Sequence, residues 1–158
     1  MKASYRWLRA LVPGLDASPR ELADRFTSAG LEVEALSEFG AGTAQLELAE
    51  VRKVEPHPSR AKLRLVTIDT GGGEQRVVCG APNVPDPGGV VAFAPLGAHL
   101  PAVNMTLTPR DIGGVTSEGM LCSEHELGLV LGPGQRGGHD GILVYAAGKA
   151  KPGTPLRQ

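Results

Sequence analysis

The densest group of side chains suited to chemistry is a basic run between residues 52 and 64. It contains one acid, Glu55, and five cations: Arg52, Lys53, Arg60, Lys62 and Arg64. Guanidinium and ammonium groups gathered in this way are the usual protein ligands of phosphate. Such a run can equally be a solvated strand edge, and charge alone does not choose between the two. The run therefore indicates either a phosphate-binding stripe or a polar surface without a ligand.

The overall charge adds no support for a polyanionic partner. Across 158 residues, 16 Lys and Arg stand against 17 Asp and Glu, for a net charge of −1. Domains that bind nucleic acid are commonly basic as a whole. Any binding of phosphate must therefore be local to the run.

A second group could supply a nucleophile: Cys79, Ser117, Cys122 and Ser123, with His125 nearby in the sequence. A nucleophile needs a base within hydrogen-bond reach and a third group that orients the base. Cys122 and His125 would lie on one short segment without such a third group, and no G-x-S-x-G elbow is present. We therefore predict no catalytic residue in this chain.

Metal and cofactor sites are not indicated either. The two cysteines form no C-x-x-C pair, and the four histidines add no zinc-binding spacing. A disulfide between Cys79 and Cys122 stays open, although buried thiols are the commoner arrangement in a reducing compartment. The triple glycine at 71–73 lacks the Lys-Ser/Thr of a phosphate loop and is typical of a hairpin turn.

The first 39 residues predict a helix, a second helix and a strand. Apolar residues recur with helical spacing over residues 4–12, and Pro13-Gly14 ends that pattern. Ser18-Pro19-Arg20-Glu21 is a capping box that begins a helix running to about Ala29. Alternation over residues 31–36 predicts a half-buried strand.

From Gly40 onward helical periodicity is lost, and short apolar runs alternate with Gly/Pro clusters. This pattern is typical of a small barrel or sandwich, and five or six strands in about 110 residues fit a five-stranded barrel. A short helix from Ser123 to Leu127 is also predicted, with Ser123 as its cap. The predicted strands cover residues 46–54, 63–68, 77–78, 90–94, 105–107 and 142–145.

No stretch approaches the ~20 apolar residues that a membrane span requires. The first seven residues are charged and aromatic, so we read no secretory signal. We therefore expect a cytoplasmic protein without a membrane partner.

Five short motifs then combine into one pattern. They are His57-Pro58 with Lys62-Leu63, Cys79 to Asn83, Gly97 to Pro101, Ser117 to Ser123, and Glu126-Leu127-Gly128. In this order they resemble the tRNA-binding OB-fold barrel of bacterial phenylalanyl-tRNA synthetase beta subunits, which occurs in related form in methionyl-tRNA synthetase tails. The resemblance implies a mainly β fold: a five-stranded OB-fold barrel inserted after a small N-terminal helix-helix-strand (α+β) segment.

The residues before the barrel choose the subfamily. Trp7-Leu8-Arg9 and residues 29–34 resemble the opening of the beta subunit, and residues 152–156 resemble the return of its chain into the first domain. A free-standing tRNA-binding protein or a methionyl-synthetase tail is disfavoured by the N-terminal helix pair. We expect an N-terminal fragment with an α+β segment at 1–39, a tRNA-binding OB-fold at 40–151 and a truncated return segment at 152–158.

The resemblance also implies a function. The fragment would be a non-catalytic tRNA-binding module of a phenylalanine–tRNA ligase, which uses ATP and magnesium. Its partners would be tRNA and the alpha subunit, in an alpha2-beta2 heterotetramer. The fragment itself would hold no cofactor or metal. The predicted tRNA-binding residues are Arg52, Lys53, His57, Arg60, Lys62, Arg64, Ser117 and Ser123.

Two departures from the family pattern bear on this function. Arg60 stands where the family usually has an acid, and Ile112-Gly113-Gly114 lacks an arginine that is often present there.

Between Gly40 and Lys151 the aromatic residues are Phe93 and Tyr145, so base stacking is expected to be weak. Recognition would then rest on the RNA backbone and shape. The alternative is a structural module that braces the synthetase with little direct tRNA contact.

Overall fold

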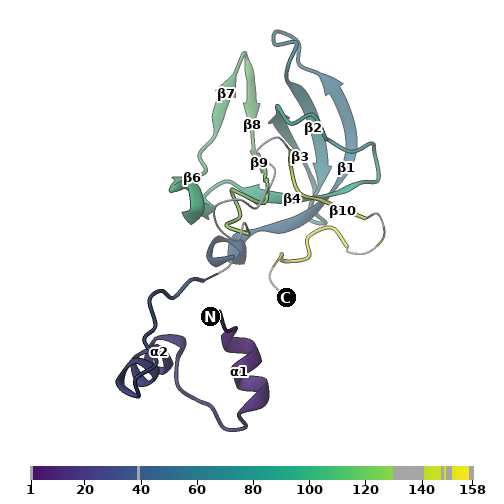
Figure 1. The fold of residues 1–158 in the computed structure, drawn as a ribbon. Helices are drawn as coiled ribbons and strands as arrows, with labels where there is room; N and C mark the ends of the chain where they lie inside the picture. Colours follow the sequence, from purple (N-terminus) through teal and green to yellow (C-terminus); the bar gives the residue numbers. More distant parts are fainter. Residues whose placement is uncertain (1, 39, 130–140, 147, 149–150, 157–158) are drawn as a thin grey trace. The chain divides into compact units, whose positions relative to one another are not determined.

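The computed structural model describes residues 2–38, 40–129, 141–146, 148 and 151–156. The chain divides into two compact units, Met1–Glu38 and Phe39–Gln158 (Figure 1). Neither of the two α-helices, nor any other helix in the described part of the chain, is long and apolar enough to cross a membrane.

The first unit contains helices α1 (Tyr5–Leu11) and α2 (Pro19–Ser28). The predicted capping box is confirmed: the Glu21 N–H donates to Ser18 Oγ at 3.3 Å, and the Ser18 N–H donates to Glu21 Oε2 at 2.7 Å. The hydrogen bond from the Ser18 backbone is the main cause that lowers the pKa of the Glu21 carboxyl. Pro19 occupies the first turn, where its missing N–H leaves no unpaired donor.

The strand predicted for residues 31–36 is wrong, since this segment has no regular secondary structure. A strand needs a neighbour for its backbone hydrogen bonds, and the described residues of this unit form no other strand. Several large apolar side chains of the first unit are also exposed: Trp7, Leu11, Val12, Leu31 and Leu36.

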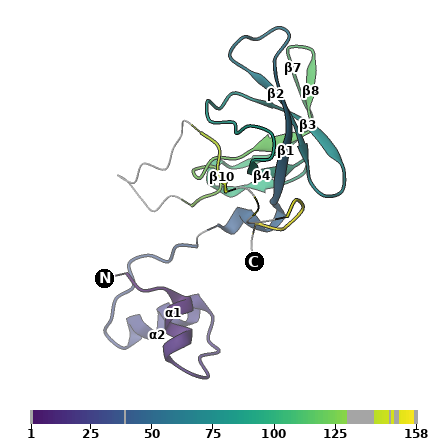
Figure 2. The ribbon, with the colours of Figure 1, turned by 90° about the vertical axis from the view of Figure 1, so that its right-hand side faces the viewer.

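The second unit is a nearly closed β-barrel, and it confirms the predicted mainly β OB-fold (Figure 2). The main sheet has the order β10-β4-β1-β2-β3, with β9 paired to β4. Between β3 and the start of β9 the barrel is closed by a backbone hydrogen bond, in which the Glu118 N–H donates to Arg76 O at 3.0 Å. The strands of this sheet are β1 (Glu47–Pro56), β2 (Arg64–Asp69), β3 (Glu74–Cys79), β4 (Val90–Pro95), β9 (Gly119–Leu121) and β10 (Val144–Tyr145).

Alternation along these strands explains the register. In β2, Val66 and Ile68 are buried while their neighbours face outward, and in β3, Val77 and Cys79 do the same. The triple glycine forms the turn between β2 and β3, as predicted, so that Asp69 pairs with Glu74. The register of β1 against β2 shifts between Val51 and Lys53, which places Arg52 at an irregularity.

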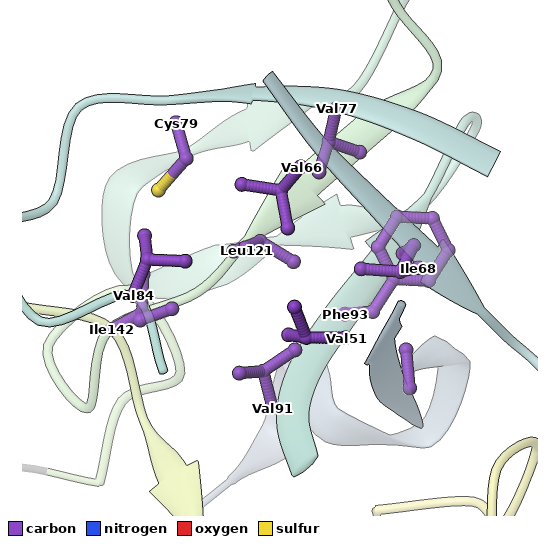
Figure 3. Packing of buried hydrophobic residues seen from close by; sticks show 11 residues of the cluster. Val51, Val66, Ile68, Val77, Cys79, Val84, Val91, Phe93, Leu121 and Ile142 are labelled. Atoms are coloured by element: carbon purple, nitrogen blue, oxygen red, sulfur yellow. The ribbon is translucent and has the colours of Figure 1, made fainter. Parts of the chain in front are cut away.

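The main core lies inside the barrel (Figure 3). Phe93 of β4 is fully buried and belongs to a cluster with residues from β1, β2, β3, β4 and β9. The cluster consists of Ala49, Val51, Val66, Ile68, Val77, Cys79, Val84, Val91, Phe93, Leu121 and Ile142. Continuous burial of β4, from Val90 to Ala94, matches its place between β1 and the β9–β10 side.

Several elements differ from the sequence prediction. Four short strands were not predicted: β5 (His99–Leu100), β7 (Arg110–Ile112), β8 (Val115–Ser117) and β9. Strand β6 (Met105–Thr106) falls in a predicted run, and two short 3-10 helices cover Ala41–Gln45 and Pro101–Val103. The helix predicted at Ser123 is a turn instead, although its capping hydrogen bonds are present.

The segment 152–156 lies along the start of β1. The Leu48 N–H donates to Thr154 O at 2.9 Å, and the Leu156 N–H donates to Leu46 O at 2.9 Å. The predicted domain boundaries at 39 and 151, and a return into an interrupted first domain, stay predictions. Residues 39, 149, 150, 157 and 158 lie outside the described part of the chain.

Candidate nucleic-acid interface

The loop between β1 and β2, residues 57–63, carries two cations of the basic run, Arg60 and Lys62, and a third, Arg64, begins β2. Backbone bonds close it into a compact turn: the His57 N–H donates to Leu63 O at 3.1 Å, and the Leu63 N–H donates to Arg60 O at 2.9 Å. Arg60, Lys62 and Arg64 are exposed here and at the start of β2. None of the three forms an ion pair with a described residue. Their charges are therefore available to an anionic partner.

The other half of the run is occupied by neighbouring acids. Arg52 forms ion pairs with Glu50 Oε1 at 2.5 Å and with Asp69 Oδ2 at 2.6 Å. The hydrogen bond from Arg52, followed by one from the Gly71 N–H, holds the pKa of the Asp69 carboxyl below its usual range. Lys53 pairs with Glu55 at 2.9 Å. These two cations lie beside carboxylates that offset their charge.

His57 is buried, with only 4% of its surface exposed. Its Nδ1 lies 3.2 Å from the Ser59 N–H, which donates to it, and its Nε2 lies 2.7 Å from Ile112 O. Because Nδ1 accepts, we assign the ring proton to Nε2, which donates to the carbonyl. Both ring nitrogens are thus engaged within the fold.

Ser117 and Ser123 are also buried and bonded internally. Ser117 Oγ donates to Gly119 O at 2.9 Å and accepts from the Val78 N–H at 3.0 Å, so it helps to close the barrel. Ser123 Oγ donates to Glu126 Oε2 at 2.7 Å. A ligand could reach either hydroxyl only by breaking these bonds. The sequence predicted that His57, Ser117 and Ser123 bind RNA. Their burial and their internal hydrogen bonds do not support direct contact with RNA.

A cleft of about 830 Å³ lies between the outer face of β1–β3 and the β7–β8 hairpin. In both ribbon views this hairpin extends beside the ends of β1 and β2 (Figures 1 and 2). The residues that line the cleft include three cations and three acids, so the cleft has no net charge. The lining consists of Arg52, Lys53, Glu55, Thr67, Glu74, Gln75, Arg76, Gly114, Val115, Thr116 and Glu118.

The cleft and the loop beside it therefore differ in their free charge. Two of its cations, Arg52 and Lys53, are paired with acids. A neutral cleft does not concentrate polyanions, whereas a loop with unpaired cations does. In OB-folds the face of the second and third strands and the loop between the first two strands bind oligonucleotides. Within the basic run, the cations without an ion-pair partner among the described residues lie on that loop and at the first residue of β2.

The described residues are not arranged for covalent or metal chemistry. Both thiols are buried and unpaired, and burial raises the pKa of Cys79 and raises that of Cys122 to about 12. Within the described ranges, no three His, Cys, Asp or Glu side chains are grouped so that they could hold a metal ion. What the first loop and the start of β2 offer is the positive charge of Arg60, Lys62 and Arg64, which can bind anions.

Sequence reasoning missed the contact between the first loop and the β7–β8 hairpin. Ser59 Oγ donates to Gly113 O at 2.9 Å, from residues 54 positions apart. The Gly113-Gly114 dipeptide between alternating residues is a hairpin signal and could have revealed β7 and β8. Nothing in the sequence shows that His57 and Ser59 would meet that turn.

Comparison with known proteins finds a family profile and relatives whose descriptions refer to tRNA. The family profile described as "Putative tRNA binding domain" matches residues 46–155. The beta subunit of phenylalanine–tRNA ligase from Syntrophus aciditrophicus is 43% identical over 129 residues, which cover 82% of this chain and 16% of that protein. The corresponding subunit from Chlorobaculum tepidum is 40% identical over 148 residues, covering 91% of this chain and 17% of that protein.

Among solved structures, a MetRS-related protein from Pyrococcus horikoshii has a TM-score of 0.46 at 21% identity, covering 71% of this chain and 88% of that one. The chain spans about one sixth of the length of the two ligase subunits. Because the family profile covers most of the chain, including every strand of the main sheet, this protein belongs to the family of tRNA-binding domains.

Proposed function

We propose that this chain is the tRNA-binding module of a phenylalanine–tRNA ligase beta subunit and that it binds RNA phosphates through Arg60, Lys62 and Arg64. One observation carries this assignment of residues. These three side chains are exposed without an ion-pair partner among the described residues, whereas Arg52 and Lys53 of the same basic run are paired. An exposed cation without an internal partner can neutralise phosphate at the lowest desolvation cost.

The same surface favours contact with the RNA backbone. Phe93 is fully buried, and the half-buried Tyr145 packs against the second apolar cluster of the barrel. Neither ring is an open platform for a base, so stacking of unpaired bases contributes little. Recognition by charge and shape suits a folded RNA such as tRNA.

The wider activity is part of this proposal. The relatives are named as ligase subunits, and we propose that the whole protein attaches phenylalanine to tRNA(Phe) with an alpha subunit, as a cytoplasmic alpha2-beta2 enzyme. The described residues form no cluster that fits magnesium. We propose that ATP and magnesium serve the ligase reaction of the whole protein, and we assign neither to a described residue of this chain.

The proposal is tested by titrating the 158-residue chain with a tRNA(Phe) transcript over a series of salt concentrations. We expect the logarithm of affinity to fall against the logarithm of salt with a slope of about −2 to −3, because each neutralised phosphate contributes roughly −0.7 to −0.9. The triple variant Arg60→Ala, Lys62→Ala, Arg64→Ala should flatten the slope to near zero.

Lys151→Ala is the matched control. This exposed lysine precedes Pro152, whose carbonyl lies against Gly71 at the turn between β2 and β3, at the opposite end of β2 from Arg64. We expect it to leave affinity and slope nearly unchanged. A flat slope in the unmodified chain, or equal losses from Lys151→Ala and Lys62→Ala, would contradict the proposed interface.

A second candidate function is structural bracing of the synthetase. It is favoured by the uncovered apolar side chains of the first unit, among them Trp7, Leu11 and Leu31, since exposed groups of this kind mark protein contacts. Under this function, Trp7→Ser with Leu11→Ser would weaken assembly of the whole enzyme while tRNA binding by this chain stays the same. The triple loop variant would do the reverse under the first function.

A further inference from the structure

We propose that His57 and Ser59 are positioning residues for RNA binding. They fasten the loop that carries Arg60 and Lys62 to the tip of the β7–β8 hairpin and so fix where these two cations stand. This inference rests on the proposed function, because it concerns how the same loop is held for phosphate. It gives a buried histidine a structural role in binding.

The imidazole of His57 joins two segments that are far apart in the sequence. Its Nε2 donates to Ile112 O at 2.7 Å, across 55 residues, while its Nδ1 accepts the Ser59 N–H at 3.2 Å within its own loop. The ring is nearly excluded from solvent, so these bonds do not compete with water. One side chain thus ties the start of the loop to the last residue of β7.

Ser59 adds a second attachment one residue further along the hairpin. Its hydroxyl donates to Gly113 O at 2.9 Å. Two adjacent carbonyls of the hairpin, those of Ile112 and Gly113, therefore accept bonds from two side chains of the loop. Arg60 follows directly in the sequence, so its starting point is fixed by this attachment.

Gly113 shows how closely the two segments approach. A Cβ atom at this position would lie 2.6 Å from Ser59 Oγ, 3.0 Å from His57 Cε1 and 3.2 Å from Arg60 Nε. Gly114, the next residue of the same turn, has open space where its Cβ would stand. Both glycines have left-handed φ angles, +63° and +86°. An alanine would therefore be strained at both positions but would clash with the loop only at position 113.

This difference gives a matched pair of variants that change no charge. Gly113→Ala should push the loop away from the hairpin, and we expect about fivefold weaker tRNA binding, the usual scale for coupled neighbours. Gly114→Ala carries similar strain without the clash and should change affinity by less than about twofold. Thermal unfolding of both variants reports any loss of the fold itself.

Double variants separate positioning from a general loss of structure. Ser59→Ala and His57→Ala should weaken tRNA binding in the unmodified chain but have no further effect once Arg60 and Lys62 are alanine, because the cations that they position are gone. His57→Gln can still donate an N–H toward Ile112 O and should restore part of the affinity.

Amide hydrogen exchange tests the attachment without RNA. Ser59→Ala and Gly113→Ala should speed exchange in residues 59–63 while exchange in β2 stays slow. If the loop exchanges as slowly in these variants as in the unmodified chain, the attachment does not order it and the inference fails. It also fails if Gly113→Ala and Gly114→Ala weaken binding equally, or if the effect of Ser59→Ala is undiminished without the two cations. A chain that binds no tRNA but shows the exchange effect refutes the proposed function and leaves the attachment established.

Discussion

The side-chain amide of Asn83 forms two hydrogen bonds with the backbone of Ile142. Its Oδ1 accepts the Ile142 N–H at 2.8 Å, and its Nδ2 donates to Ile142 O at 2.8 Å. The amide thus acts as a short strand that joins the loop between β3 and β4 to the segment before β10. The Cys-Gly-Ala-Pro-Asn motif that marks the family therefore ends on a structural residue.

This pairing predicts the cost of replacing Asn83 with aspartate. Asn83→Asp keeps the acceptor for the Ile142 N–H but turns a second oxygen toward Ile142 O, where no hydrogen is available. We expect a loss of about 2 kcal/mol in the free energy of unfolding at neutral pH, measured with denaturant. The loss should shrink in acid, because a protonated carboxyl can again donate. Equal stability of Asn83→Asp and the unmodified chain would contradict the double hydrogen bond.

Gly119 lies where β9 meets β4 most closely. A Cβ atom there would contact the Phe93 ring and lie 2.6 Å from Ala94 O, and the φ angle is +153°. Gly119→Ala should therefore cost about 3 kcal/mol of unfolding free energy, the sum of backbone strain and overpacking. The measurement is the denaturant midpoint.

Gly88→Ala is the control for that substitution. Gly88 also has a left-handed φ, +93°, but its Cβ would stand in open space. It should cost about 1 kcal/mol from strain alone. Similar losses for the two alanine variants would show that strain, and not the approach of β4, sets the requirement at Gly119.

The elements that the sequence predicted correctly are those with local causes. The capping box of α2 is written in four consecutive residues, and the turn at 71–73 in three glycines. Long alternating strands such as β2 and β3 also carry their own signal. The strand predicted at 31–36 has the same alternation but no partner within its unit, and pairing is not a local property.

The basic loop was predicted from composition, but the state of each charge was not. Arg52 and Asp69 are 17 residues apart and meet only because β1 pairs with β2. Ser59 and Gly113 meet only because the β7–β8 hairpin lies beside that loop. Which cations are free and which side chains are buried depends on tertiary contacts, so the sequence alone could not show that His57, Ser117 and Ser123 are buried.

The two cysteines should be inert toward thiol reagents in the folded chain. Both are buried and unpaired, and burial raises the pKa of Cys122 to about 12, so almost none of it is thiolate at neutral pH. A colorimetric thiol reagent should label neither residue rapidly until denaturant is added, and then both. Rapid labelling of one thiol in the native chain would contradict its burial.

The pairing of Arg52 with Asp69 predicts a change in stability below the usual pKa of an aspartate. In the folded chain the pKa of the Asp69 carboxyl is lowered, mainly by the hydrogen bond from Arg52. The stability that this carboxylate adds to the fold is therefore complete above the ordinary pKa of 3.8 and is lost as the pH falls through the lowered pKa. In Arg52→Gln we expect NMR titration to show the pKa of Asp69 rising toward 3.8, because the largest cause is removed while the Gly71 N–H still donates. Glu47 is the internal control: its pKa is raised by burial, without a contribution from Arg52, and should not move. If the pKa of Asp69 is the same with and without Arg52, the ion pair is not held in solution, and Arg52 is as available to RNA as Arg60 is.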